Sequence, residues 1–248
     1  MKYLLLLIVI FILSACHSTL QQANERGLEQ MKQNQYAEAI TTFNTILKEK
    51  ADWYPAYYNR AISHANLKQY NQALKDFNYF LANFPNHANS YLNRAILYEN
   101  LGQYAQAIKD YSETIKLHPT SIVAYHYRGI ARFHMNDFDG ALQDYNQALL
   151  LGKDVKMDIV TAKEIGLNSS ALYFNRGVVL QKKGNYKAAV QDYTQAIAID
   201  PSNAKIYYNR AIAQMSLSQS EEAKKDLEIA SHLGLEAASK TLTTYFPQ

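Results

Sequence analysis

Gln35-Tyr36-Ala37-Glu38-Ala39-Ile40 is one copy of a six-residue stretch that recurs along the chain and decides its fold. The copies begin at Gln35, Gln69, Gln103, Asp137, Asn185 and Gln219. Consecutive copies start thirty-four positions apart, except that a longer spacing of forty-eight separates the fourth from the fifth. The chain therefore holds six repeat units, with an insertion of fourteen positions in the array. A fixed period of this kind predicts units that stack on their neighbours, because one unit alone cannot bury its apolar face.

Two columns of small residues accompany this stretch. The column before it reads Gly27, Ala61, Ala95, Gly129, Gly177 and Ala211, and the column inside it reads Ala39, Ala73, Ala107, Ala141, Ala189 and Ala223. A proline closes three units, at Pro85, Pro119 and Pro201. From about Gln21 to the end of the chain, this pattern resembles the tetratricopeptide repeat (TPR) family. The departures are Ala51, Lys153 and Leu235 in place of the closing proline, and Ser220 in place of the aromatic residue at the turn.

The resemblance implies an all-α fold, a right-handed α-solenoid of six helical hairpins. Repeats 1–4 would occupy residues 21–155 and repeats 5–6 residues 170–237, followed by a C-terminal cap and tail at 238–248. We expect a capping helix over Glu236–Tyr245, because a terminal repeat otherwise exposes apolar surface. The insertion, residues 156–169, contains a stretch with helical potential at Asp158–Ile165. It is either an addition that contacts a partner or a neutral insertion, and both interpretations remain open.

Aromatic residues follow the repeat in three further columns, which account for most of the 20 tyrosines. One column precedes the second helix, one lies seven residues later, and one opens the first helix. The members are Tyr36, Tyr70, Tyr104, Phe138 and Tyr186; Phe43, Phe77, Tyr111, Tyr145 and Tyr193; and Tyr57, Tyr91, Tyr125, Tyr173 and Tyr207. We interpret these columns as packing between helices, not as a stacking platform for nucleic-acid bases.

An arginine and an aspartate also recur. The arginines are Arg26, Arg60, Arg94, Arg128, Arg176 and Arg210, and Asp76, Asp110, Asp144, Asp192 and Asp226 follow them by sixteen residues in five units. The Asn-Arg-Gly/Ala motif around several of these arginines resembles a common TPR subclass. One interpretation is a row of arginines for an acidic partner. The other, which helical spacing favours, is a buried ladder in which each Asp pairs with the Arg of the following unit.

In the TPR family, binding usually takes place on the concave face, which the first helices line. The positions that correspond to it here are Tyr58, Ile62, Leu92, Ile96, His126, Ile130, Phe133, Phe174, Val178, Tyr208 and Ile212. Co-chaperones of the family clamp a C-terminal carboxylate with Lys and Asn at such positions, and the apolar residues argue against that ligand. An apolar, aromatic groove suits an extended segment or a helix of a partner. The alternative is that this stripe is buried between successive first helices or under a C-terminal helix.

The N-terminus carries an export pattern. Lys2 precedes ten consecutive apolar residues, Leu4–Leu13, a run that fits a signal peptide and is too short to span a bilayer. The run closes in Leu13-Ser14-Ala15-Cys16, which resembles the lipobox of bacterial lipoproteins. The resemblance implies that residues 1–15 are removed, that the Cys16 thiol carries a diacylglycerol and that residues 16–20 form a short linker. Since residue 17 is His and not Asp, it also implies an outer-membrane anchor facing the periplasm.

Catalysis and cofactors find no support in the sequence. His126 and His134 share a helix but lie about 12 Å apart at a rise of about 1.5 Å per residue, too far to share a zinc ion. No H-E-x-x-H, G-x-S-x-G or P-loop motif occurs. A formal charge of +3 is no footprint for nucleic acid. We therefore expect no enzyme, no cofactor and no metal site.

Two functional hypotheses remain. The first is a lipid-anchored scaffold or adaptor that binds other envelope proteins or peptides. The second is a self-associating structural lipoprotein whose apolar stripe is buried in a homodimer.

Overall fold

The computed structural model describes residues 19–154 and 169–247, and these residues form helices joined by short turns, with no strand among them. The chain divides into two compact units, Met1–Glu113 and Thr114–Gln248. The helices of the first unit are residues 19–32, α2 (Tyr36–Glu49), α3 (Tyr54–Asn66), α4 (Tyr70–Asn83), α5 (Ala88–Asn100) and most of α6 (Tyr104–Leu117). Those of the second unit are the end of α6, α7 (Ile122–His134), α8 (Phe138–Asp154), α10 (Ser169–Lys182), α11 (Tyr186–Ile199), α12 (Ala204–Ser216), α13 (Ser220–His232) and α14 (Glu236–Tyr245).

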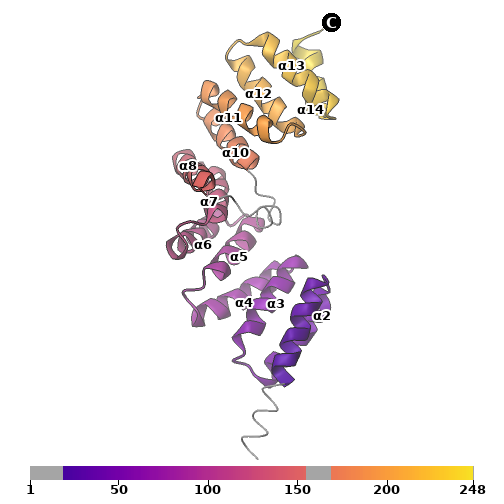
Figure 1. The fold of residues 1–248 in the computed structure, drawn as a ribbon, viewed down its shortest axis with the longest axis vertical. Coiled ribbons are helices and arrows are strands. Elements are labelled where there is room, and N and C mark those ends of the chain that lie inside the picture. The colour runs from indigo at the N-terminus through magenta and orange to yellow at the C-terminus, as the bar shows by residue number, and fades with distance from the viewer. Residues whose placement is uncertain (1–18, 155–168, 248) are drawn as a thin grey trace, which may run out of the picture. The chain divides into compact units, whose positions relative to one another are not determined.

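Neighbouring helices pair as hairpins, α3 with α4 in the first unit, and α7 with α8, α10 with α11 and α12 with α13 in the second (Figure 1). Within each unit, successive hairpins also pack on each other, as α2 does on α3, α4 on α5, and α11 on α12. This arrangement confirms the predicted all-α solenoid of TPR-like helical hairpins.

Each hairpin turn ends its first helix with a residue in the left-handed region. The residues concerned are Asn34, Lys68, Gly102, Asn136, Gly184 and Ser218, with φ between 58° and 77°. At the first turn, Gln35 N–H donates to Gln30 O at 2.8 Å and Asn34 N–H donates to Met31 O at 3.0 Å. This Schellman pattern satisfies the last carbonyls of the helix and reverses the chain. Glycine adopts the conformation at no steric cost, which explains Gly102 and Gly184.

The small-residue column lets the two helices of a hairpin approach closely. A Cβ added at Gly177 would lie 2.7 Å from Tyr193 Cε1, and one at Gly129 would lie 2.9 Å from Tyr145 Cε1. Both tyrosine rings are almost completely buried. The prediction that these tyrosines fill the space beside the small residues is confirmed.

The predicted ladder between repeats is wrong in its pairing. Each aspartate accepts two hydrogen bonds from the arginine of its own hairpin, as when Arg60 Nε and Nη2 each lie 2.7 Å from an Asp76 oxygen. Asp110, Asp144, Asp192 and Asp226 are held in the same bidentate way by Arg94, Arg128, Arg176 and Arg210. The arginine and the aspartate are sixteen residues apart, so they lie on opposite sides of the turn, facing each other on the two helices of the hairpin. The carboxylates are buried, so the pairs link the two helices within a hairpin.

The link between repeats uses a neutral acceptor instead. The second terminal nitrogen of Arg60 donates to Asn44 Oδ1 at 2.6 Å, in the second helix of the preceding hairpin. Arg94, Arg176 and Arg210 reach Asn78, Asn146 and Thr194 in the same way. Each of these arginines therefore joins its own hairpin to the one before it.

The same arginines explain the tyrosine that opens each first helix. The guanidinium carbon lies 5.3–5.8 Å from the ring centroid of the tyrosine three residues earlier in all five hairpins with a full Arg–Asp pair. Residues three apart on a helix share a face, and a cation over an aromatic ring is attracted to it. Tyrosine, arginine and aspartate thus form one clamp, which repeats along the chain with the same geometry.

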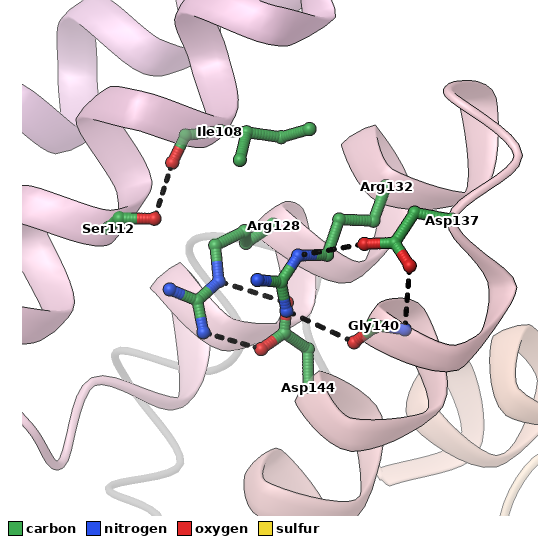
Figure 2. A network of polar contacts seen from close by, with 7 residues as sticks. All are labelled: Ile108, Ser112, Arg128, Arg132, Asp137, Gly140 and Asp144. Atoms are coloured by element: carbon green, nitrogen blue, oxygen red, sulfur yellow. Dashed lines mark hydrogen bonds and ion pairs between the residues drawn. The ribbon is translucent and has the colours of Figure 1, made fainter.

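At Asp144 the clamp has a second arginine (Figure 2). Arg132 Nη1 lies 2.8 Å from Asp144 Oδ2 and donates to the Gly140 carbonyl at 3.2 Å. Asp137, in turn, accepts from Gly140 N–H and pairs with Arg132 Nε at 3.5 Å. The buried carboxylate of Asp144 is therefore neutralised from two sides.

The ends of the array follow the sequence with one change. The chain is already helical at Thr19, earlier than the start expected near Gln21. The predicted capping helix is present as α14, whose Ala238 is fully buried against the last hairpin. Residues 1–15, the Cys16 lipidation site and the helical stretch predicted at Asp158–Ile165 lie outside the described residues, while Ser169 opens α10.

Candidate functional site

The predicted groove residues lie on the first helices α3, α5, α7, α10 and α12. Within each unit, we call the surface that these residues form the first-helix face. All of them are half-buried except His126, which is buried. The stripe is thus neither fully exposed nor fully buried, and the residues that cover it differ from one helix to the next.

Part of the stripe fills the seams, the lines of contact between successive first helices. In the first unit, Tyr58 and Ile62 pack against a core cluster that includes Leu97 of α5. In the second unit, Phe174 and Val178 pack against the cluster that includes Ile206 of α12. At these seams the side chains are therefore buried in part between successive hairpins and remain accessible in part.

Other residues of the stripe also pack against core clusters. Ile130 and Phe133 on α7 pack beside the cluster that contains Val179 of α10. Tyr208 packs beside the cluster of the last hairpin. Ala238 of α14 belongs to this cluster, and Leu242 of α14 packs against it. Helix α14 packs mainly on α13, so it occupies the place of a next first helix and does not run along the stripe. Leu92 and Ile96 on α5 are half-buried in the first unit.

An asparagine crosses each of two seams. Asn93 Nδ2 on α5 lies 3.4 Å from the Tyr58 hydroxyl on α3. Asn175 Nδ2 on α10 lies 2.9 Å from His126 Nε2 on α7. In both cases the asparagine that precedes the clamp arginine finds its acceptor on the preceding first helix.

This contact corrects the assignment of His126 to an open groove. The His126 side chain is 7% exposed, because Asn175 and the rings of Tyr127 and Tyr145 surround it. An amide nitrogen only donates, so Nε2 accepts and the ring proton resides on Nδ1, which has no hydrogen-bond partner among the described residues. Burial lowers the pKa of His126 to about 4. The ring is therefore a neutral seam residue at pH 7, unavailable to a ligand.

The seam between α10 and α12 differs. Here the residue that corresponds to Tyr58 and His126 is Phe174, which offers no acceptor. Asn209 turns back along its own helix and donates to Lys205 O at 2.8 Å. Asn209 also lines a depression of about 430 Å³ on the first-helix face.

The depression is lined by both apolar and polar side chains. Its lining residues are Val178, Gln181, Lys182, Tyr186, Asn209, Ile212 and Ser216. Val178 and Ile212 are predicted groove residues, whereas the polar members were not predicted. The signal for them was present in the sequence as the phenylalanine that precedes Asn-Arg at Phe174, where Tyr58 and His126 supply a polar atom. Apolar contact with a few placed donors and acceptors is typical of sites that hold peptide segments.

Neither a metal-binding cluster nor a membrane-spanning helix occurs in residues 19–154 and 169–247. No group of three or more His, Cys, Asp or Glu side chains in this part of the chain is placed to hold a metal ion. None of the described helices combines the length and apolar character that a membrane crossing requires.

Comparison with known proteins agrees with this geometry. Three family models match the chain: a tetratricopeptide repeat model over residues 24–88, a second over residues 88–121 and a TPR repeat model over residues 177–218. No curated protein sequence matches the chain.

Several solved structures share the fold. The C-terminal part of a TPR repeat-containing protein from Cytophaga hutchinsonii has a TM-score of 0.71 at 18% identity, over 90% of this chain and 87% of that one. YrrB, a TPR protein with an unusual peptide-binding site, has a TM-score of 0.66 at 16% identity, over 82% and 97%.

The APC/C hetero-tetramer Cut9–Hcn1 matches with a TM-score of 0.66 at 19% identity, over 90% of this chain, which spans 42% of that one. At such identities these likenesses show the fold alone. Together with the family matches and the hairpin geometry, they lead to one conclusion: the chain belongs to the tetratricopeptide repeat family.

Proposed function

We propose that this protein is a membrane-anchored scaffold or adaptor of the bacterial cell envelope, which holds a segment of another protein on its first-helix face. The proposal is based on the depression between α10 and α12, where Asn209 makes its hydrogen bond within its own helix and not across the seam. TPR proteins generally mediate protein–protein interactions. The fold is typical of binding proteins, and we propose no enzymatic activity.

The lining of the depression suggests the kind of segment it takes. Val178 and Ile212 offer apolar contact, while Gln181, Asn209 and Ser216 supply both donors and acceptors. Lys182 adds one positive charge at the rim. An extended segment with one or two apolar side chains, free backbone groups and an acidic residue fits these features.

The anchor is the second part of the proposal. The lipobox-like Leu13-Ser14-Ala15-Cys16 supports export, loss of residues 1–15 and acylation of Cys16. A diacyl chain with a further acyl group gives the two-signal attachment that stable membrane binding needs. With His17 after the cysteine, we propose the periplasmic face of the outer membrane.

Site-specific photocrosslinking in cells tests the binding part. A photoreactive residue in place of Ile212 is expected to crosslink a discrete partner, and Asn209→Ala is expected to lower the yield. The matched control carries the photoreactive residue in place of Ile229, an exposed apolar residue on the second helix α13. Equal yields from the two positions would contradict the proposal.

The homodimer hypothesis gives a different outcome in the same experiment. If the crosslinked product is a second copy of this chain, the first-helix face serves self-association.

The anchor is tested separately by the mass of the N-terminal peptide, which should carry acyl chains that disappear in Cys16→Ala. A peptide of unmodified mass would refute the anchor while leaving the binding site intact.

A further inference from the structure

Several aromatic residues of the first unit lie outside the repeating packing columns, and four of them lie near the start of α3 or on α4 and the turn after it. They are Trp53, Tyr54, Tyr79 and Phe84, and we call them the aromatic edge. One repeat further along the chain, the equivalent positions hold His87, Ala88, Glu113 and His118. The next repeat folds without Phe, Tyr or Trp at these positions. The repeat fold itself therefore does not require the four rings.

Three of the rings, those of Tyr54, Tyr79 and Phe84, are in contact and partly exposed. The Tyr54 ring stacks on Tyr79 at a centroid distance of 6.1 Å and meets Phe84 edge-on at 5.1 Å. Tyr79 is 43% exposed and Phe84 is 42% exposed. The Lys50 ammonium lies 5.4 Å from the centroid of the Trp53 ring. The edge thus presents rings to its surroundings, with a lysine beside them.

The aromatic edge lies where the chain enters the first hairpin. Trp53 packs on the same core cluster as Leu20, the second described residue, which is 5% exposed. Trp53 also directly precedes α3, so it belongs to the end of the hairpins at which first helices begin. Only two residues separate Cys16 from Thr19, and a chain of that length reaches at most about 11 Å.

We propose that the aromatic edge lies in the interfacial region of the lipid bilayer. This inference rests on the proposed acylation of Cys16, which brings a bilayer within about 11 Å of Thr19. Aromatic side chains such as Trp and Tyr concentrate at membrane–water interfaces. Tyr79 and Phe84 are the exposed rings of the edge, whereas the Trp53 ring is half-buried and its Nε1 atom is buried. Lys50 and Asp52 balance in charge, so the rings and not electrostatic attraction drive the contact.

The chain contains its own reporter, because Trp53 is its single tryptophan. Full-length acylated protein, purified from membranes, is reconstituted into phosphatidylcholine vesicles brominated at acyl carbons close to the headgroup. Bromine quenches tryptophan at short range, so we expect Trp53 fluorescence to fall about twofold relative to unbrominated vesicles, as for an interfacial ring. Quenching by lipid brominated near the chain ends should be weaker. Replacing part of the lipid with phosphatidylglycerol should change neither value.

Two sets of variants control for position and for folding. Trp53→Phe with Leu67→Trp moves the reporter to the opposite end of α3, a helix of 13 residues and so about 20 Å long, and should abolish the quenching. Tyr79→Ser with Phe84→Ser should reduce quenching of Trp53, whereas Leu67→Ser with Leu101→Ser, which removes two exposed leucines at the far ends of α3 and α5, should not. Circular dichroism verifies that each variant is helical.

The outcomes separate this inference from the proposed function. Acylated, vesicle-bound protein with an unquenched Trp53 overturns the membrane contact and leaves the anchor standing. A photoreactive residue in place of Phe84 that crosslinks a protein and no lipid in native membranes also overturns it, in favour of a protein partner. Absence of acyl mass on Cys16 overturns the anchor and the membrane contact together.

Discussion

Two seams of the second unit, α7–α10 and α10–α12, are built from the same repeat and end in different surfaces. At the first, Asn175 meets His126 Nε2 at 2.9 Å and the seam is closed. At the second, Phe174 stands where His126 would, Asn209 bonds within its own helix, and a depression of about 430 Å³ remains. The side chain in the acceptor position therefore distinguishes the two seams.

The largest expected effect comes from the clamp that both seams share. Asp192 is 5% exposed and accepts two hydrogen bonds from Arg176, which also reaches Asn146 in the preceding hairpin. Asp192→Ala leaves this arginine without its carboxylate and should lower the free energy of unfolding by about 3 kcal/mol or more. Urea unfolding followed by circular dichroism measures the change. The neighbouring exposed residue supplies the control, Gln191→Ala, and an equal loss in both variants would refute the structural role of the clamp.

The pairing within this clamp also shows where sequence reasoning stops. The regular period and the columns of Ala39 and Tyr36 were sufficient to predict hairpins, because each position has one packing role in every unit. Spacing placed Asp76 on the inward face, but it did not reveal which arginine faces it, and the inter-repeat assignment was wrong. That choice depends on how far the chain advances around the turn, which only the folded backbone shows.

The candidate site was predicted to a similar depth. Val178 and Ile212 lie on first helices, α10 and α12, where the TPR resemblance had placed them, and their part in binding stays a prediction. His126 was misplaced because the side chain that covers it, Asn175, lies far along the chain, beyond the insertion. Asn209 has no cross-seam acceptor because Phe174 lacks a polar atom. Only a comparison of the position before Asn-Arg in one repeat with the asparagine of the next repeat reveals this.

The closed seam should make stability depend on pH. Burial lowers the pKa of His126 from 6.5 to about 4, so the unfolded chain takes up the proton more readily than the folded one. Stability is then complete above about pH 6.5 and declines as the pH falls from there towards 4, by up to about 3 kcal/mol. Unfolding at pH 7 and at pH 4.5 measures the decline. His126→Phe, which copies the open seam, should flatten this dependence, and an unchanged decline would rule out His126 as its source.

A smaller effect is expected at the seam of the first unit. The 3.4 Å contact between Asn93 and the Tyr58 hydroxyl is long and partly exposed. Asn93→Ala should therefore cost about 0.5–1 kcal/mol in the free energy of unfolding. Thermal unfolding of this variant beside Asn209→Ala sharpens the contrast, because Asn209 spans no seam and its loss should leave stability almost unchanged. A greater loss in Asn209→Ala would mean that the two asparagines have the opposite roles.

The central claim is that Phe174 opens the α10–α12 seam to a partner by leaving Asn209 without a cross-seam acceptor. Phe174→Tyr tests it most directly, since it adds the hydroxyl that Tyr58 presents to Asn93 and changes little else. The measurement is the yield of the partner crosslink from a photoreactive residue in place of Ile212, in otherwise native and Phe174→Tyr protein. We expect a yield several-fold lower in Phe174→Tyr at equal stability and expression. An equal yield in the two proteins would contradict it.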